Sequence, residues 1–413
     1  MAASSKPLVN FLESLKPSRL DTRLLQASLW ERPQADLAWQ QWLAEVGQPK
    51  AFFQNNSQGK KGLLPFLGYR SGLAMGFDVD SDFATYLRVA QVREDLRNGL
   101  FMGLLKDILG RLAERHVRPV LVNGAGYALS VYANPNCRHN HGIDFLVRPR
   151  QLRVADQTAR ELGFRAVGRN QRFHRSPRTY QHHNGLALTL RTCLFSIPHA
   201  PTARGYWQRT RRIDVGGIDV NILGAADMLC HTLTEAAAAP NRANLRWAVD
   251  TFELLKCSGS QLCKQLVTSS PNESLVTWPV PVLLDYFRTQ LNSPVDESDV
   301  QTLFELEPLR TREATTLALS TALRTNGNKS QLLSCGRDDW GTMLNAARFA
   351  LMPSVQHMLH KYNESNLLRL PLLYLDRSSR GVMRPFTRRM RGGKPGQTVP
   401  SGQDSQLKLR TNQ

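Results

Sequence analysis

The sequence predicts an α+β protein in which a mixed sheet is flanked by helical regions on both sides. Three observations support this prediction. Apolar residues recur at helical spacing up to about residue 115, short strand-like segments and a glycine hairpin follow, and helical spacing returns from Ala225. We therefore expect four parts: an N-terminal helical region (1–115), an α/β subdomain (116–224), a C-terminal helical region (225–376) and a basic tail too polar to fold (377–413).

The N-terminal region is expected to contain several helices. Two segments carry leucines and tryptophans at helical spacing: Leu20, Leu24, Leu25 and Leu29, then Leu37, Trp39, Trp42 and Leu43. After a polar loop at 54–61, Ser81 or Asp82 is placed to cap a long helix that reaches about Arg115. We expect the apolar stripe of this helix to lie in the core: Tyr86, Val89, Val92, Leu96 and Leu100.

The segment from 120 to 147 is the one around which the chain is organised. It reads as a short apolar strand (120–122), a turn containing Gly124 and Gly126, the start of a helix, and an irregular Asn- and His-rich stretch. A second strand at 143–147 carries one carboxylate, Asp144. Glycines let backbone amides approach phosphate groups, and a carboxylate on the next strand is placed to hold a metal ion.

The rest of the α/β subdomain predicts more of the sheet. A helix at 151–162 ends at Gly163, strand-like pieces follow at 164–167, 173–182 and 186–194, and Gly216-Gly217 forms the turn of a hairpin at 211–222. We expect a mixed sheet with helices on one side. Further helices are expected at 227–239, 244–256, 278–291, 300–306, 311–323 and 340–362, with serine-rich segments near 258–274 between them.

Charge is the strongest compositional signal. The chain of 413 residues has a formal net charge of +19. Residues 138–212 contain fifteen arginines, no lysine and three acids, and residues 377–413 contain nine basic residues and one acid, so the remainder is close to neutral. Because guanidinium groups bind phosphate bidentately, this distribution favours a nucleotide or another polyanion as the partner.

Two further features concern location. The six cysteines show no CxxC pairing, which indicates reduced thiols. No apolar run approaches the length of a transmembrane helix, and the first residues lack a signal-peptide core. We expect a cytoplasmic protein.

At these residues the sequence resembles an uncharacterised bacterial nucleotidyltransferase family of the polymerase-β-like superfamily, over roughly 20–371. Members read leucine-leucine-lysine-glycine-alanine at the first strand, where residues 121–125 here read Leu-Val-Asn-Gly-Ala. They read aspartate-isoleucine-aspartate-leucine-leucine-valine at the second, preceded by an arginine; here Arg138 precedes Gly-Ile-Asp-Phe-Leu-Val at 142–147. Asn-Leu-Arg-Trp-Ala-Val-Asp at 244–250 also matches a characteristic helix of the family.

The resemblance implies a polymerase-β-like fold and transfer of a nucleotidyl group from a nucleoside triphosphate to an acceptor, with magnesium as the cofactor. In that scheme Asp144 is the catalytic residue and the metal ligand. The nucleotide-binding residues are Gly124, Ala125, Gly126, Arg138 and Arg148, where the amides hold phosphates and the arginines neutralise developing charge.

The departures from the family pattern affect the residues that would carry out the chemistry. Gly142 stands at the first aspartate, and Asn123 stands at the lysine before the glycine. On the strand at 186–194, Thr189 stands where a third acid is expected and Arg191 where a histidine is frequent. These losses favour an alternative: a catalytically degraded member that keeps the fold as a nucleotide- or nucleic-acid-binding module. A scaffold role in a polysaccharide or peptide-modification pathway is a third reading.

Several residues have an alternative, purely structural interpretation. Asp144 needs a partner in an apolar strand, and a salt bridge to Arg138 or Arg148 would serve as well as a metal. The pairs His139/His141 and His182/His183 would suit only softer ions than magnesium and are otherwise ordinary loop residues. Asp214 and Asp219 are expected to face solvent, His231 and Glu235 lack a third metal ligand, and Arg246, Trp247 and Asp250 are expected to link helix and sheet.

Two basic segments are candidates for binding surfaces. One is an arginine block interleaved with aromatic residues, which is suited to a triphosphate or single-stranded nucleic acid: Arg138, Arg148, Arg150, Arg169, Arg172, Arg175, Arg178 and Arg191. The other is the leucine- and arginine-rich segment 367–391. We expect its leucines to pack on the helical region, with a membrane-surface anchor as the alternative.

Overall fold

The computed structural model describes residues 15–55, 59–72, 81–167, 177–194, 205–238, 244–268, 279–306 and 370–375. The chain divides into two compact units, Met1–Ala346 and Ala347–Gln413. All elements named below belong to the first unit. In the second unit, the described residues 370–375 are helical.

Seven strands of the described chain form one mixed sheet in the order β3-β4-β5-β2-β1-β7-β6. Their bounds are β1 Val120–Val122, β2 Gly142–Leu146, β3 Arg165–Ala166, β4 Arg178–Gln181, β5 Ala187–Arg191, β6 Arg211–Asp214 and β7 Asp219–Ile222. Strand β1 is antiparallel to β2 and parallel to β7, and β2 is parallel to β5. This confirms the α+β expectation of a mixed sheet between helical regions.

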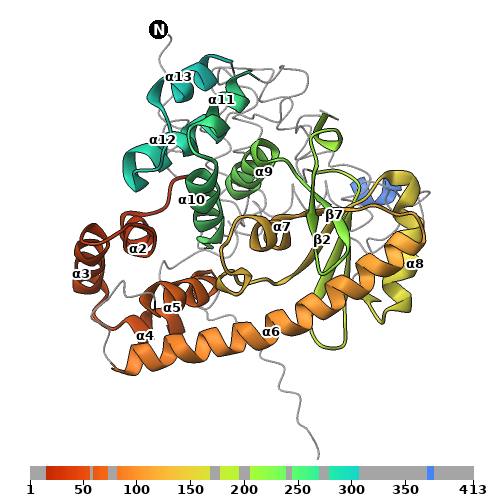
Figure 1. The fold of residues 1–413 in the computed structure, drawn as a ribbon, viewed down its shortest axis with the longest axis horizontal. Coiled ribbons are helices and arrows are strands. Elements are labelled where there is room, and N and C mark those ends of the chain that lie inside the picture. Colours follow the sequence, from red (N-terminus) through yellow and green to blue (C-terminus); the bar gives the residue numbers. More distant parts are fainter. Residues whose placement is uncertain are drawn as a thin grey trace, which may run out of the picture. The chain divides into compact units, whose positions relative to one another are not determined.

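Helices cover both faces of this sheet, so the expectation of helices on one side was wrong (Figure 1). One core cluster joins Leu121, Phe145 and Leu188 to α6 (Ser81–Glu114) and α8 (Leu152–Glu161). A second cluster joins Val122 and Leu146 to α7 (Asn123–Ser130) and α9 (Ala225–Ala238). Alternate strand residues point to opposite faces, and here both sets of side chains are buried. The side that carries Asp144 therefore faces α7 and α9.

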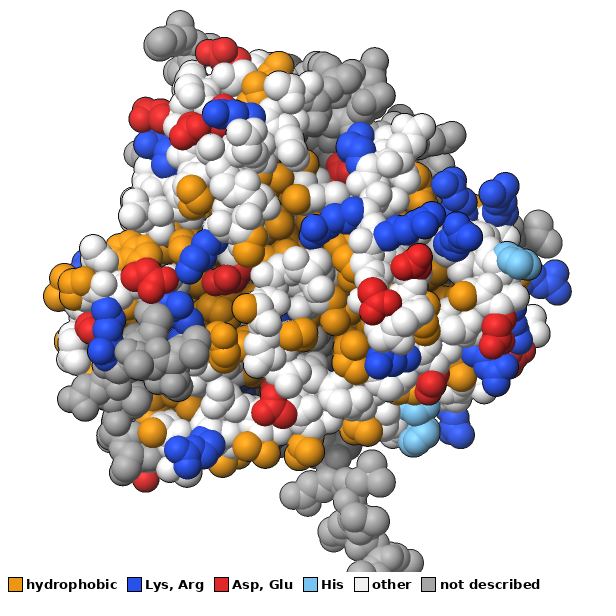
Figure 2. All heavy atoms as spheres, viewed as in Figure 1, with side chains coloured by type: hydrophobic (Ala, Val, Ile, Leu, Met, Phe, Trp, Pro, Cys, Tyr) orange, Lys and Arg blue, Asp and Glu red, His pale blue; other side chains and the backbone are white. Residues whose placement is uncertain are grey.

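The N-terminal helices are α2 Arg19–Leu29, α3 Gln34–Val46, α4 Pro49–Asn55, η1 Lys60–Leu63, α5 Leu64–Gly72 and α6. Helix α6 packs differently from our expectation. Val89, Val92, Leu96 and Leu100 are 50–70% exposed, and hydrophobic side chains line the edge of the molecule where α6 runs (Figure 2). The buried face instead carries Phe83, Leu87, Glu94, Asn98 and Phe101. The apolar stripe was therefore assigned to the wrong side, because the buried side contains two polar residues.

The C-terminal helices are α9, α10 Arg246–Ser258, α11 Gln261–Thr268, α12 Pro279–Leu291 and α13 Glu297–Leu306. Helix α11 occupies part of the serine-rich stretch that we expected to be irregular, and it buries Leu262, Cys263 and Leu266. The helices expected at 311–323 and 340–362, most of 367–391 and the basic tail at 377–413 lie outside the described residues. Within the part that is described, no helix is long and apolar enough to cross a membrane.

Candidate functional site

The connection from β1 to α7 is tighter than the glycine turn we expected. Both Gly124 and Gly126 lie within the first turn of α7, and Asn123 makes the change of direction with a φ of 56°. Asparagine tolerates this left-handed conformation better than most residues. The two glycines are therefore not needed for the backbone of the turn.

Gly124 is needed because Arg138 lies across it. A Cβ atom at position 124 would overlap the guanidinium group of Arg138 and would come within 2.9 Å of Asn140 Oδ1. The guanidinium of Arg138 thus lies against this glycine. Packing requires a glycine at position 124, and its role in phosphate binding stays a prediction.

Arg138 is held in a buried ion pair with Asp250 on α10. Its Nε lies 2.9 Å from Asp250 Oδ1 and its Nη2 lies 2.8 Å from Asp250 Oδ2, and Tyr132 donates to Oδ1 at 2.8 Å. The remaining nitrogen, Nη1, donates to Asn140 Oδ1 and to the carbonyl of His139. The charge of Arg138 is therefore offset by Asp250, which links the α/β subdomain to the C-terminal helices.

Asp144 occupies the centre of the sheet between β1 and β5. Its register partners are Val122 on β1 and Thr189 on β5. Its charged partner is Arg191, whose Nε lies 3.7 Å from Asp144 Oδ1. The Arg191 side chain is 14% exposed and the Asp144 side chain is 23% exposed. The sequence predicted that a salt bridge would satisfy Asp144 in the absence of metal, but it pointed to Arg138 or Arg148 rather than to Arg191.

Gly142 leaves no room for the missing aspartate. It pairs with Ala187 across the β2–β5 ladder, and a Cβ atom at position 142 would overlap the carbonyl oxygen of Ala187. A side chain of any kind at this position requires the two strands to move apart. The close approach of the two strands therefore excludes an aspartate at position 142.

The residues around Asp144 do not fit a magnesium site. Two-metal transfer needs carboxylates that converge on two ions about 3.5–4 Å apart, and magnesium prefers oxygen ligands. Here a glycine and a threonine stand at the two positions where further acids are expected, and the charged partner of Asp144 is an arginine. Throughout the described ranges, no group of three or more His, Cys, Asp or Glu residues is arranged to hold a metal ion.

His231 on α9 lies on the same side of the sheet. Its Nε2 donates to the carbonyl of Leu194 at 3.0 Å, and the side chain is buried. Burial lowers the pKa of His231 below its usual value, the charge of Arg191 adds to this effect, and Glu235 and Asp144 oppose it. His231 is therefore a neutral hydrogen-bonded residue close to the Asp144–Arg191 pair.

A second polar cluster lies before β2, where the sequence suggested ordinary loop histidines. His139 Nδ1 lies 2.5 Å from Glu94 Oε2, and the other oxygen of Glu94 accepts from the Asn140 amide at 3.2 Å. A cavity of about 250 Å³ adjoins this pair, and Arg93, His141 and Arg246 contribute to its walls. Partial burial and the charge of Arg246 lower the pKa of His141 to about 3. Sequence reasoning missed Glu94. Its position on the side of α6 opposite the apolar stripe was a signal that could have identified it.

Arg148 lies away from the other predicted site residues. Because β1 and β2 are antiparallel, Val122 pairs with Asp144 at one end and Val120 pairs with Leu146 at the other. Arg148 follows that second end, where its guanidinium lies 4.7 Å from the centre of the Trp207 ring. The structure therefore brings Gly124, Ala125, Gly126 and Arg138 together near Asp144, and it does not bring Arg148 to them.

The remaining candidates divide between surface and core. Asp214 and Asp219 are exposed on the hairpin, as expected. Arg178 pairs with Asp156 at 3.4 Å, and Arg169, Arg172 and Arg175 lie outside the described residues. His182 is buried and His183 is exposed. The five described cysteines are free thiols, and three are buried: Cys137, Cys230 and Cys263.

Comparisons with known proteins identify a family and similar solved structures. Residues 60–288 match the model of a family described as uncharacterised nucleotidyltransferase. The solution structure of the antibiotic-resistance factor ANT(2'')-Ia is similar at 13% identity, with coverage of 46% of this chain and 92% of that one and a TM-score of 0.31. An antigenic nucleotidyltransferase-like protein from Paracoccidioides brasiliensis is similar at 11% identity, with coverage of 50% and 93% and a TM-score of 0.32. No curated protein matches the sequence.

Proposed function

The chain belongs to the uncharacterised nucleotidyltransferase family, and from this premise we propose that it binds the phosphate groups of a nucleotide without carrying out metal-dependent transfer. Family membership supports a general role in nucleotidyl transfer. The proposal takes the alternative to catalysis, in which the fold is kept as a binding module. Its main support is the ion pair of Asp144 with Arg191.

Arg191 supplies a fixed positive charge where a metal-dependent enzyme would hold its cations. A guanidinium binds phosphate oxygens through two parallel hydrogen bonds and does not require a metal. Helix α7 begins immediately after Val122, the register partner of Asp144, so its N-terminal amides lie on this side of the sheet. We propose that Arg191 and these amides contact the phosphates.

The proposal makes Asp144 a group that opposes binding. In a metal site, Asp144→Asn removes a ligand, so binding and turnover are lost together. In the proposed site the same change removes a negative charge beside Arg191 and so strengthens the attraction of the guanidinium for a phosphate. The two functions therefore predict opposite effects of one substitution.

The test combines nucleotide binding with turnover. Each nucleoside triphosphate is titrated by calorimetry in magnesium, in manganese and in a chelator, and pyrophosphate release is assayed in the same samples. We expect binding in the chelator, no pyrophosphate, and loss of binding in Arg191→Gln. Metal-dependent binding together with pyrophosphate release that disappears in Asp144→Asn would contradict the proposal and establish a working transferase.

A further inference from the structure

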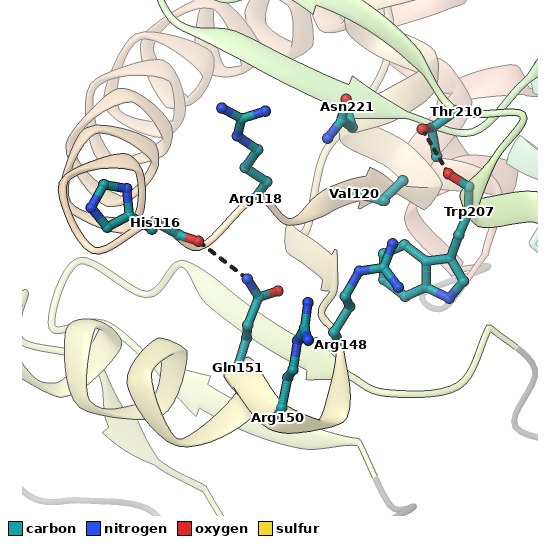
Figure 3. Close-up of a pocket in the computed structure, with 9 residues that line it drawn as sticks. All are labelled: His116, Arg118, Val120, Arg148, Arg150, Gln151, Trp207, Thr210 and Asn221. Carbon is teal, nitrogen blue, oxygen red and sulfur yellow. Dashed lines mark hydrogen bonds between the residues drawn. The ribbon is translucent and has the colours of Figure 1, made fainter.

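We propose that a pocket at the other end of β1 is a separate binding site for the phosphate group of a small phosphate monoester. The pocket has a volume of about 260 Å³. Its described lining residues come from the start of β1, the segment after β2, and the β6–β7 region: His116, Arg118, Val120, Arg148, Arg150, Gln151, Trp207, Thr210 and Asn221. Figure 3 shows these side chains around one opening.

The charge of this pocket is uniformly positive. Arg118, Arg148 and Arg150 contribute three guanidinium groups, and the described lining contains no aspartate or glutamate. These three arginines also form no ion pair with any carboxylate of the described residues, in contrast to Arg138, Arg178 and Arg191. Three guanidinium groups that line one pocket, with no ion-paired carboxylate among the described residues, are stabilised by an anion.

Neutral groups in the same pocket are suited to orient that anion. Gln151 is fixed by a hydrogen bond from its Nε2 to the carbonyl of His116 at 3.2 Å (Figure 3). Asn221 lies beside Val120 in the β1–β7 ladder, which places its amide on the rigid part of the fold. The guanidinium of Arg148 lies 4.7 Å from the centre of the Trp207 ring. Because this contact already restricts the side chain, Arg148 loses less side-chain entropy when it binds a ligand.

The size of the pocket restricts the ligand. Sites for drug-sized molecules typically have volumes of about 300–1,000 Å³, and this pocket lies below that range. It therefore accommodates a phosphate group and part of the molecule attached to it. A phosphate monoester carries two negative charges near neutral pH and matches three arginines better than a singly charged phosphodiester.

This site is independent of the function proposed for Asp144. In the β1–β2 ladder, Val122 and Asp144 stand at one end and Val120 and Leu146 at the other. Arg148 and Arg150 follow the second end. Arg191 pairs with Leu146 in the β2–β5 ladder, but neither Arg191, Asp144 nor any residue of α7 lines this pocket, so either proposal can fail without the other.

The experiment titrates the full-length protein with ribose 5-phosphate, inorganic phosphate and a single-stranded oligonucleotide at two salt concentrations. Trp207 reports on the location: its indole N–H signal, assigned by its loss in Trp207→Phe, is expected to shift on saturation with ribose 5-phosphate. Arg118→Gln and Arg150→Gln are the test variants. Arg153→Gln is the matched control, since Arg153 is an exposed arginine of α8 outside the pocket.

We expect saturable binding of ribose 5-phosphate that weakens about 10- to 100-fold in each test variant and less than about twofold in Arg153→Gln, on the strength of charge-assisted hydrogen bonds. Inorganic phosphate is expected to compete. Failure of both small ligands to saturate would overturn the proposal. So would equal weakening by Arg153→Gln, or an oligonucleotide that binds more tightly and loses affinity equally in all three arginine variants.

Discussion

At the scale of single residues, the site is defined by which charges are paired with one another. Arg138 is neutralised by Asp250 and fixed over Gly124, and Arg191 is placed beside Asp144. The resemblance predicts phosphate binding by Gly124 and Arg138, and in the structure these two residues pack against each other. The charge that is adjacent to the surviving carboxylate comes from Arg191, at a position where the family frequently has histidine.

A first prediction concerns Gly124. Gly124→Ala is expected to displace Arg138 from Asp250 and to lower the free energy of unfolding by about 2–4 kcal/mol, because a buried ion pair is disrupted. Gly99→Ala on α6 is the control, since a Cβ atom there meets nothing within 4 Å. That change is expected to stabilise the protein by about 0.5–1 kcal/mol through helix propensity. Urea denaturation of both variants measures the difference, and equal effects would refute the packing role.

A second prediction concerns His231 and pH. Its pKa is lowered in the folded state by burial, so below about pH 6.5 the unfolded state binds a proton that the folded state does not. The stability contributed by neutral His231 is therefore complete above that pH and is lost as the pH falls. As the pH falls from 7 to 5, His231→Gln is expected to lose less stability than the wild type. Identical pH profiles in urea denaturation would show that His231 is protonated in the folded protein.

At the scale of elements, α6 is the clearest case of an error with a physical cause. The apolar stripe of Val89, Val92, Leu96 and Leu100 is exposed. The buried side of α6 includes Glu94 and Asn98, which hold the segment before β2. Buried polar groups are acceptable when they are hydrogen-bonded. An apolar stripe alone therefore did not identify the packed face.

This assignment of the two faces leads to a third prediction. Leu96→Ser on the exposed stripe is expected to change the free energy of unfolding by less than about 0.5 kcal/mol, as is usual for surface positions. Leu105→Ala on the buried face is expected to cost about 2–5 kcal/mol, because it leaves a cavity in the core. Chemical denaturation measures the free energy of unfolding of the two variants. A large loss in Leu96→Ser would mean that the stripe is covered.

The sheet and its hairpin were more accessible to sequence reasoning than the site was. Alternation and turn glycines predicted β6 and β7, whose turn at Gly216 and Gly217 has φ values of 63° and 89°. The helix end at Gly163 was predicted for the same reason, with a φ of 83°. The partner of Asp144 was not predictable, because the register of β2 against β5 brings Arg191 close and no local pattern determines that register.

At the scale of the whole molecule, positive charge gathers on one part of the face drawn in Figure 2. There, Lys and Arg side chains lie over the part that contains β7 and α8 in Figure 1. The net charge of the full sequence is +19. This basic face favours anionic ligands in general. The Asp144–Arg191 pair determines whether a phosphate binds at the candidate site.

The most direct test of the central claim is the affinity for a nucleoside triphosphate in a chelator, compared between the wild type and Asp144→Asn. Asp219→Asn, which removes a 74% exposed carboxylate from β7, controls for net charge. We expect Asp144→Asn to bind about 3- to 10-fold more tightly than the wild type, with Asp219→Asn unchanged. Binding that requires magnesium and is abolished in Asp144→Asn would contradict the account, because Asp144 would then be a metal ligand.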